Sequence, residues 1–180
     1  MSGRLIAVVG PSGVGKDTVM AALAAAVPAL GLVRRVITRP ADAGGEDFDS
    51  ATQAAFAEMQ QAGHFALSWA AHGLQYGIPA TVDVELRGGR DLLVNLSRAV
   101  LPQAQARFDK LIVLSLTASP DVLAARLGAR GREDAAEIAA RLARAGAGIP
   151  EGIDALTIDN SGPLDQTVKA AQAALYPVRV

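Results

Sequence analysis

The sequence predicts a single α/β domain in which helices cover both faces of a parallel β-sheet. Short apolar segments recur along the chain and helical stretches separate them, an alternation that is typical of parallel sheets. Two of these segments, 91–97 and 110–116, show no clean polar–apolar alternation, so both of their faces are expected to be buried. No internal repeat or low-complexity linker divides the 180 residues, and we therefore expect one domain over 1–180.

The first element is a short apolar strand at 4–9, which leads into glycine-rich sequence. Good helix formers follow at 16–26, and Pro28 ends that helix. A weaker final strand is expected at 155–160. The other predicted helices cover approximately 98–108, 120–130, 134–146 and 163–175.

The segment "GPSGVGK" at 10–16 matches the first seven positions of the phosphate-binding loop pattern G-x-x-x-x-G-K-[ST]. It lies between a predicted strand and a predicted helix, which is the context that this motif requires. Glycines let main-chain N–H groups point at an anion, and the helix N-terminus attracts it. Lys16 is expected to reach the β- and γ-phosphates of a nucleoside triphosphate. The loop residues expected to bind it are Gly10, Pro11, Ser12, Gly13, Val14, Gly15 and Lys16.

The next position departs from the pattern, because Asp17 stands where a Ser or Thr usually holds Mg²⁺ and Thr18 follows one residue late. No acidic residue ends the strand at 110–116, so the usual second carboxylate is not visible. Mg²⁺ prefers hard oxygen ligands such as carboxylates. We hypothesise that Asp17 approaches Mg²⁺ directly or through water. The alternative is that Asp17 caps the helix or faces solvent while Thr18 lines the α-phosphate.

The segment from about 33 to 78 breaks the strand–helix alternation and is interpreted as a small insert that binds the phosphate acceptor. It reads as a strand-like stretch, a polar loop at 41–50, a short helix at 51–63 and a β-type stretch at 64–77. The last stretch turns at His72-Gly73. Trp69 is expected in the core, and His64 and His72 in structural roles.

Ligands of such sheets bind at the carboxyl ends of the strands. Asn95, Ser97 and Arg98 follow the strand at 91–97, and Arg98 is a candidate for a second phosphate.

Composition limits the partners and the location. The formal net charge of −1 argues against a broad electrostatic grip on nucleic acid. No apolar run is long enough to span a bilayer, and no signal peptide precedes the first strand. The absence of cysteine fits a reducing compartment. We expect a soluble cytoplasmic protein with no nucleic-acid or membrane partner, and the sequence leaves the oligomeric state open.

Four segments together resemble the guanylate kinase superfamily: "GPSGVGK", "ITRP", "LQYG" and "RLGARGREDAAEIAARL". Four others, "GKD", "ALSW", "VNLSRAVLPQA" and "RGRE", are similar to the ribose 1,5-bisphosphate phosphokinases of phosphonate catabolism. The resemblance covers nearly the whole chain. It implies a P-loop kinase fold with an acceptor insert and a lid at about 126–144. It also implies Mg²⁺-dependent transfer from ATP to a sugar phosphate, ribose 1,5-bisphosphate, yielding 5-phosphoribosyl 1-diphosphate (PRPP).

The resemblance also implies roles for basic residues beyond the loop. Arg126, Arg130 and Arg141 repeat the spacing of lid arginines that close over the transferring phosphate, and Arg126 and Arg130 share one helix face. The alternative is a solvated, arginine-rich pair of helices. Asn160, after the last strand, is expected near the adenine.

In the acceptor insert, the resemblance assigns phosphate contacts but no base recognition. Arg39 falls at an acceptor-phosphate arginine, Arg35 replaces a serine, and Tyr76 matches a tyrosine on the phosphate side. The positions that recognise guanine hold Ser68, Ile78 and Leu96, which argues against a guanine acceptor. The expected acceptor site comprises Arg35, Arg39, Ser68, Tyr76, Asn95, Ser97 and Arg98.

Two other functions remain open. One is an ordinary nucleoside monophosphate kinase, guanylate kinase foremost, against which the missing guanine-binding residues argue. The other is a binding module without catalysis, but such modules typically lose the phosphate loop that this chain retains.

Overall fold

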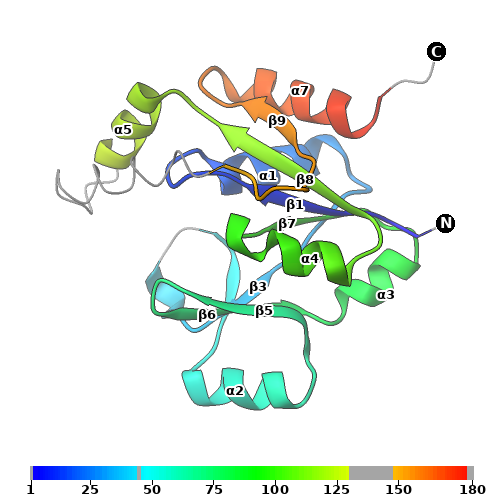
Figure 1. The fold of residues 1–180 in the computed structure, drawn as a ribbon. Coiled ribbons are helices and arrows are strands. Elements are labelled where there is room, and N and C mark those ends of the chain that lie inside the picture. The colour runs from blue at the N-terminus through cyan, green and yellow to red at the C-terminus, as the bar shows by residue number, and fades with distance from the viewer. Residues whose placement is uncertain (1, 44–45, 130–147, 178–180) are drawn as a thin grey trace.

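The structure is a computed structural model that describes residues 2–43, 46–129 and 148–177. Its main sheet has five parallel strands in the order β2-β7-β1-β8-β9 (Figure 1). This arrangement confirms the predicted parallel sheet and adds the two-residue strand β2, which the sequence did not reveal. The strands are β1 (Leu5–Val9), β2 (Gly31–Leu32), β7 (Leu92–Asn95), β8 (Leu111–Thr117) and β9 (Leu156–Asp159).

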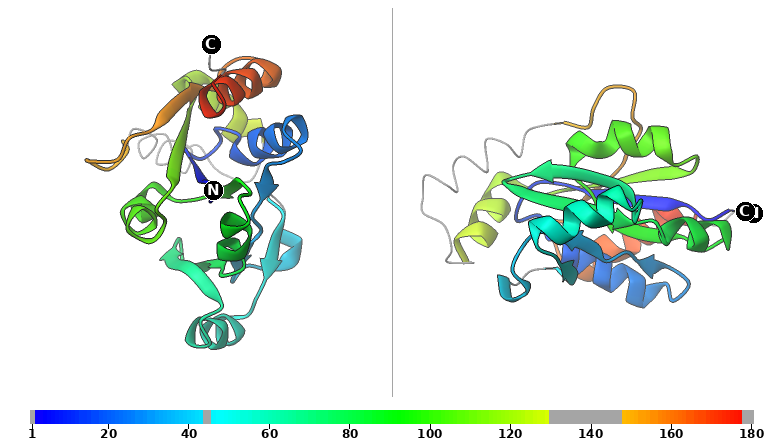
Figure 2. Two further views of the ribbon diagram at one scale, coloured as in Figure 1. Left: turned by 90° about the vertical axis from the view of Figure 1, so that its right-hand side faces the viewer. Right: turned by 90° about the horizontal axis from the view of Figure 1, so that it is seen from below.

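Helices cover both faces of the main sheet, as Figures 1 and 2 show. Alternate residues of β1 point to opposite sides, so Ile6 and Val8 pack with α1 and α7 in one apolar cluster. Leu5, Ala7 and Val9 belong to a second cluster, which includes residues of α3 and α4. The helices are α1 (Lys16–Ala26), α3 (Val82–Arg87), α4 (Leu101–Arg107), α5 (Pro120–Ala129) and α7 (Leu164–Leu175).

The predicted helix at 98–108 forms as a short 3₁₀ turn, η2 (Arg98–Val100), followed by α4. The predicted helix at 134–146 lies outside the described residues. In the described part of the chain, no helix is long and apolar enough to cross a membrane.

The segment at 33–78 forms a second sheet beside the main one, with the order β4-β3-β6-β5. Strands β3 and β4 are parallel, and the other pairs are antiparallel. The hairpin between β5 and β6 turns at His72 and Gly73, whose φ angles of 53° and 73° lie in the left-handed region. Its elements are β3 (Arg35–Ile37), η1 (Ala41–Ala43), β4 (Phe48–Ser50), α2 (Gln53–Gln61), β5 (Phe65–Ala71) and β6 (Leu74–Pro79).

The prediction of a polar loop at 41–50 was therefore wrong for its last three residues, which form β4. Three residues, Phe48–Ser50, pair with β3 although Asp49 and Ser50 are polar, because the pairing satisfies main-chain groups along the edge of β3.

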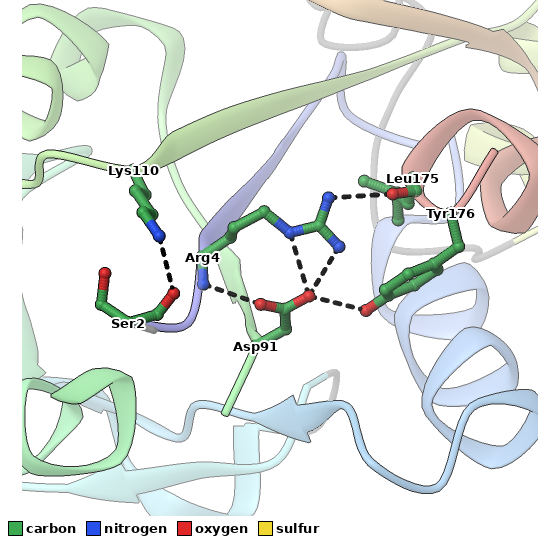
Figure 3. Close-up of polar contacts among 6 residues, drawn as sticks. All are labelled: Ser2, Arg4, Asp91, Lys110, Leu175 and Tyr176. Carbon is green, nitrogen blue, oxygen red and sulfur yellow. Dashed lines mark hydrogen bonds and ion pairs between the residues drawn. The ribbon is translucent and has the colours of Figure 1, made fainter. Parts of the chain in front are cut away.

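A polar network joins the amino-terminal ends of β1 and β7 to the end of α7 (Figure 3). Asp91 accepts hydrogen bonds from the Arg4 main-chain N–H at 2.7 Å, from Arg4 Nη2 at 2.6 Å and from the Tyr176 hydroxyl at 3.0 Å. Arg4 Nη1 also donates to the Leu175 carbonyl oxygen at 2.9 Å. The network lies at the end of the sheet opposite the carboxyl ends of its strands.

Candidate active site

A cavity of about 770 Å³ opens at the carboxyl ends of β1 and β7, between the main and second sheets. The loop after β1 forms one wall, and residues of β3, β5 and β6 contribute to the other. The loop residues that line it are Gly10, Pro11, Ser12, Gly13, Gly15, Lys16, Asp17 and Thr18. The expected acceptor residues that line it are Arg35, Arg39, Tyr76, Asn95, Ser97 and Arg98.

The loop wraps because its glycines adopt conformations that other residues avoid. Gly13 and Gly15 have φ angles of 83° and 93°, which cost glycine little. A Cβ on Gly10 would lie 2.6 Å from the main-chain oxygen of Leu116, so a side chain there would collide with β8. Helix α1 begins at Lys16, and its N-terminus faces the loop as an anion site requires.

Lys16 points back into its own loop. Its Nζ donates to the carbonyl oxygens of Gly10 at 3.0 Å and of Pro11 at 3.4 Å. Burial lowers the pKa of Lys16 to about 8; Arg35 and Arg98 add to that decrease, while Asp17 and Glu46 oppose it. The ammonium is therefore held where it lacks a strong anionic partner, and a bound phosphate would supply one.

Asp17 faces the cavity from the first turn of α1, and its Oδ1 accepts a hydrogen bond from Asn95 Nδ2 at 3.1 Å. This contact links the loop helix to the carboxyl end of β7. Among the described residues, no three His, Cys, Asp or Glu side chains gather to form a metal site. A cation beside Asp17 would thus take most of its ligands from phosphate and water, as Mg²⁺ commonly does. The Asp17 carboxylate, together with oxygens of phosphate and water, is a ligand set that suits Mg²⁺.

Two residues expected at the nucleotide instead support the loop from behind. The Asn160 side chain is buried, donates from Nδ2 to the Val14 carbonyl oxygen at 2.7 Å and accepts from Thr167 Oγ1 at 2.7 Å. Arg126 donates to the same Val14 oxygen at 3.1 Å and to the Asn160 carbonyl oxygen at 2.9 Å. Neither Asn160 nor Arg126 lines the cavity. Arg130 and Arg141 lie outside the described residues.

The two arginines of the acceptor wall have different partners. Arg35 is buried, donates from Nε to Glu46 Oε2 at 3.1 Å and forms an ion pair with Glu46 Oε1 through Nη2. Arg39 Nε and Nη2 are buried, and neither has a hydrogen-bond partner among the described residues. The Arg39 guanidinium lies 4.2 Å from the Phe48 ring centroid. Unpaired buried donors are costly, and an anion in the cavity would supply the hydrogen-bond acceptor that Arg39 lacks among the described residues.

The aromatic residues of the hairpin stack beneath Arg35. Trp69 and Tyr76 lie with ring centroids 5.3 Å apart and planes 8° from parallel. The Arg35 guanidinium carbon is 5.1 Å from the Tyr76 centroid and 5.9 Å from that of Trp69. These contacts fix the guanidinium plane from one side.

Ser68 does not line the cavity, although the resemblance placed it in the acceptor site. Side chains alternate along a strand, so Trp69 and Ala71 face the cavity from β5 while Ser68 faces away. Its hydroxyl accepts a hydrogen bond from Gln60 Nε2 of α2 at 3.1 Å.

No family model matches the chain. Curated relatives match it over nearly its whole length. The ribose 1,5-bisphosphate phosphokinase PhnN of Ruegeria sp. (strain TM1040) is 54% identical, covering 98% of this chain and 94% of that protein. The proteins of the same name from Pseudomonas paraeruginosa (strain PA7) and Agrobacterium fabrum (strain C58) are 48% and 44% identical over 97% and 95% of this chain. The chain belongs to the ribose 1,5-bisphosphate phosphokinase family.

Solved structures show that this family member has a P-loop kinase fold. A guanylate kinase from Anaplasma phagocytophilum superimposes with a TM-score of 0.73 at 17% identity, covering 97% of this chain and 85% of that chain. A gluconokinase from Sinorhizobium meliloti superimposes with a TM-score of 0.57 at 18% identity, covering 97% and 91%. At these identities the likeness concerns the fold alone.

Several cavity residues of this phosphokinase family member were not predicted from the sequence, among them Glu46, Trp69 and His72. Glu46 sits in a stretch that reads as a polar loop, and no local pattern distinguishes it from neighbouring acids. Trp69 packs against the core, as expected, but it also lines the cavity. His72 lines the cavity from the hairpin turn, where a structural role was expected.

Proposed function

We propose that this chain transfers the γ-phosphoryl group of ATP to the C1 phosphate of ribose 1,5-bisphosphate, yielding ADP and 5-phosphoribosyl 1-diphosphate, a step of phosphonate catabolism. Membership of a family whose curated relatives carry that name supports the proposal. The observation that carries it is the buried guanidinium edge of Arg39, which has no hydrogen-bond partner among the described residues and lines the same cavity as the phosphate loop.

On the donor side, the main-chain N–H groups of the loop and Lys16 would hold the β- and γ-phosphates of ATP. Asp17 would hold Mg²⁺ on its cavity side, with Asn95 orienting the carboxylate. A magnesium ion there would offset part of the negative charge of the triphosphate. Asn160 and Arg126 keep the loop in shape through the Val14 carbonyl oxygen.

On the acceptor side, an oxygen of the C1 phosphate attacks the γ-phosphorus and the bond from that phosphorus to the β-phosphate oxygen breaks. The attacking oxygen is already anionic, so no general base is needed. The barrier comes from repulsion between two phosphates and from their positioning. Arg39 and Arg98 would hold the acceptor phosphates, and Lys16 would reduce the repulsion at the transferred group.

The charge balance of the cavity suits such an acceptor. Four basic side chains and two acidic ones line it in the described part of the chain. They are Lys16, Arg35, Arg39 and Arg98, against Asp17 and Glu46. A ribose with two phosphates carries up to about four negative charges, so a positive cavity attracts it.

The same wall offers little to a nucleobase. Ile78 is buried in the core, Ser68 faces α2, and Leu96 presents an apolar side chain. The polar edge of guanine would find no partners at these three positions, at about 1–3 kcal/mol for each unpaired group. Guanosine monophosphate is therefore a poor acceptor on this reasoning.

A competition assay tests the proposal. The enzyme is supplied with ATP and equal concentrations of ribose 1,5-bisphosphate, GMP, AMP and dTMP, and the products are followed by ³¹P NMR. We expect kcat/KM for the ribose bisphosphate to be at least about 100-fold higher than for any nucleotide, or about 3 kcal/mol of transition-state binding. Lys16→Ala, as a negative control, abolishes transfer to every acceptor. GDP as the dominant product, with no diphosphate at the sugar C1, would overturn the proposal in favour of a guanylate kinase.

A further inference from the structure

Arg35 and Arg39 on the acceptor wall line the same cavity, but they differ in whether their guanidinium Nε–Nη2 edge already has a hydrogen-bond partner. The Nε–Nη2 edge of Arg35 is occupied by both carboxylate oxygens of Glu46. The Nε and Nη2 atoms of Arg39 are buried without a partner among the described residues. A phosphate that needs a two-pronged guanidinium contact therefore finds it at Arg39, because Glu46 already fills the corresponding edge of Arg35.

Glu46 is then a carboxylate placed where a strongly anionic substrate must bind. Its side chain is 14% exposed, and it lines the cavity together with Lys16 and Arg98. Like charges in a low-dielectric site repel, so this carboxylate weakens binding of a bisphosphate unless it makes a compensating contact. Hydroxyl groups provide that contact, since a hydroxyl donates and a carboxylate accepts.

The geometry of the Arg35–Glu46 pair leaves capacity for two such hydrogen bonds. A carboxylate has about four acceptor positions on its two oxygens, and Arg35 uses one position on each oxygen. The pair holds the carboxylate plane fixed, while Tyr76 and Trp69 hold the guanidinium of Arg35 from below. Among the described residues, each of the two carboxylate oxygens therefore keeps one acceptor position without a partner. These two positions match a pair of neighbouring hydroxyls on a five-membered sugar ring.

We propose that Glu46 accepts hydrogen bonds from the C2 and C3 hydroxyls of the acceptor ribose, with Arg35 as the residue that positions its carboxylate. Glu46 thereby selects ribose over deoxyribose, while Arg39 binds phosphate. This inference rests on the proposed function, because it assigns a role within the same acceptor site.

The first test needs only the wild-type enzyme. Ribose 1,5-bisphosphate and 2-deoxyribose 1,5-bisphosphate are compared as acceptors at saturating ATP. Loss of one hydrogen bond to a charged group predicts that kcat/KM falls by about 10- to 100-fold for the deoxy sugar. Equal use of the two sugars would overturn the inference and leave the proposed function intact. Failure to phosphorylate either sugar would overturn the proposed function itself.

The second test asks whether Glu46 is the source of the selectivity. Glu46→Gln keeps the shape and an oxygen for Arg35 but removes the charge, and Glu46→Asp withdraws the carboxylate by one methylene. We expect the ribose-to-deoxyribose ratio of kcat/KM to fall at least about fivefold in both variants. If Glu46 only held Arg35 in place, its replacement would lower kcat/KM equally for both sugars. The ratio would then stay unchanged, and this result would overturn the inference.

Glu85→Gln is the matched control, because Glu85 pairs with Arg90 at 2.7 Å and is 40% exposed outside the cavity. It removes an Arg–Glu ion pair of the same kind, and the selectivity ratio should stay at its wild-type value. If Glu46→Gln fails to fold, Glu46→Asp and the comparison of the two sugars with the wild-type enzyme still test the inference.

Discussion

The side-chain amide of Asn160 donates a hydrogen bond to the main-chain carbonyl of Val14 over 2.7 Å, joining the end of the last strand to the middle of the phosphate loop. Arg126 donates to the same carbonyl oxygen. The shape of the loop therefore depends on two residues that lie far along the chain and outside the cavity.

Replacing Asn160 by Ala should weaken binding of any ligand that the loop holds. The Val14 carbonyl oxygen loses one of the two side-chain donors that it has among the described residues. A lost buried hydrogen bond of about 1–2 kcal/mol corresponds to about 5- to 30-fold in affinity. Calorimetry with ATP and with inorganic tripolyphosphate should give the same factor for both ligands. A loss for ATP alone would instead indicate a contact to the adenine.

Binding of ATP should take up a proton above about pH 8. Burial holds the pKa of Lys16 at about 8 in the free enzyme, and bound phosphates raise it again because they stabilise the ammonium. Above that pH the free protein has a largely neutral Lys16, so affinity falls as pH rises. Calorimetry at about pH 8.5 in buffers of different ionisation enthalpy measures the uptake. Lys16→Ala should eliminate it, and uptake that survives this change would assign the proton to another group.

Asp17→Ala should raise the Mg²⁺ concentration for half-maximal activity by about tenfold or more, if the carboxylate belongs to the coordination shell. Asp17→Ser should recover part of that loss, because it restores the hydroxyl usual at this position. Mn²⁺ binding followed by electron paramagnetic resonance in the presence of ATP gives a measurement independent of turnover. Superimposable titrations of the three proteins would show that Asp17 has no contact with the metal.

Arg39→Ala should raise the KM for ribose 1,5-bisphosphate by about 10- to 100-fold and change ATP affinity little. The reason is that the buried Nε and Nη2 atoms of Arg39 have no hydrogen-bond partner among the described residues, and an acceptor phosphate would supply one. Arg34→Ala is the control, since Arg34 is 52% exposed and pairs with Asp49 outside the cavity. Comparable effects of the two changes on acceptor KM would contradict an acceptor role specific to Arg39.

Asp91→Asn should lower the free energy of unfolding at neutral pH by about 1–3 kcal/mol. It should also make that free energy less dependent on pH in the acid range. Burial alone would raise the pKa of Asp91, but hydrogen bonds from Arg4 and Tyr176 outweigh it and hold the pKa below its usual range. A depressed folded-state pKa gives stability that is present above the unfolded pKa of about 4 and is lost as pH falls through the folded value.

Urea unfolding at about pH 7 and about pH 3 measures this difference. Asp165→Asn is the control, because Asp165 forms an exposed pair with Lys169 at 3.4 Å and such pairs contribute little. An Asp91 variant with the pH dependence of the wild type would place the acid-sensitive group elsewhere. Acceptor selectivity should not change, since the network lies at the opposite end of the sheet from the cavity.

Local patterns were sufficient for much of the fold. The predicted strands at 4–9, 91–97 and 110–116 form the three central strands of the main sheet, where mainly apolar strands are covered on both faces. The helix at 16–26 has the predicted bounds, since its start follows the loop glycines and its end precedes Pro28. The hairpin turn at His72-Gly73 was likewise readable from its residues.

The sequence alone was enough to predict the phosphate loop, the apolar strands and the strand ends that border the cavity, because each is marked by residues that are close together in the chain. Tertiary structure alone decided the partners of side chains. Glu46 meets Arg35 because β3 and β4 pair, and Asn160 reaches Val14 because β9 ends beside the loop. Ser68 turns away because the strand face depends on pairing register, which no local pattern encodes.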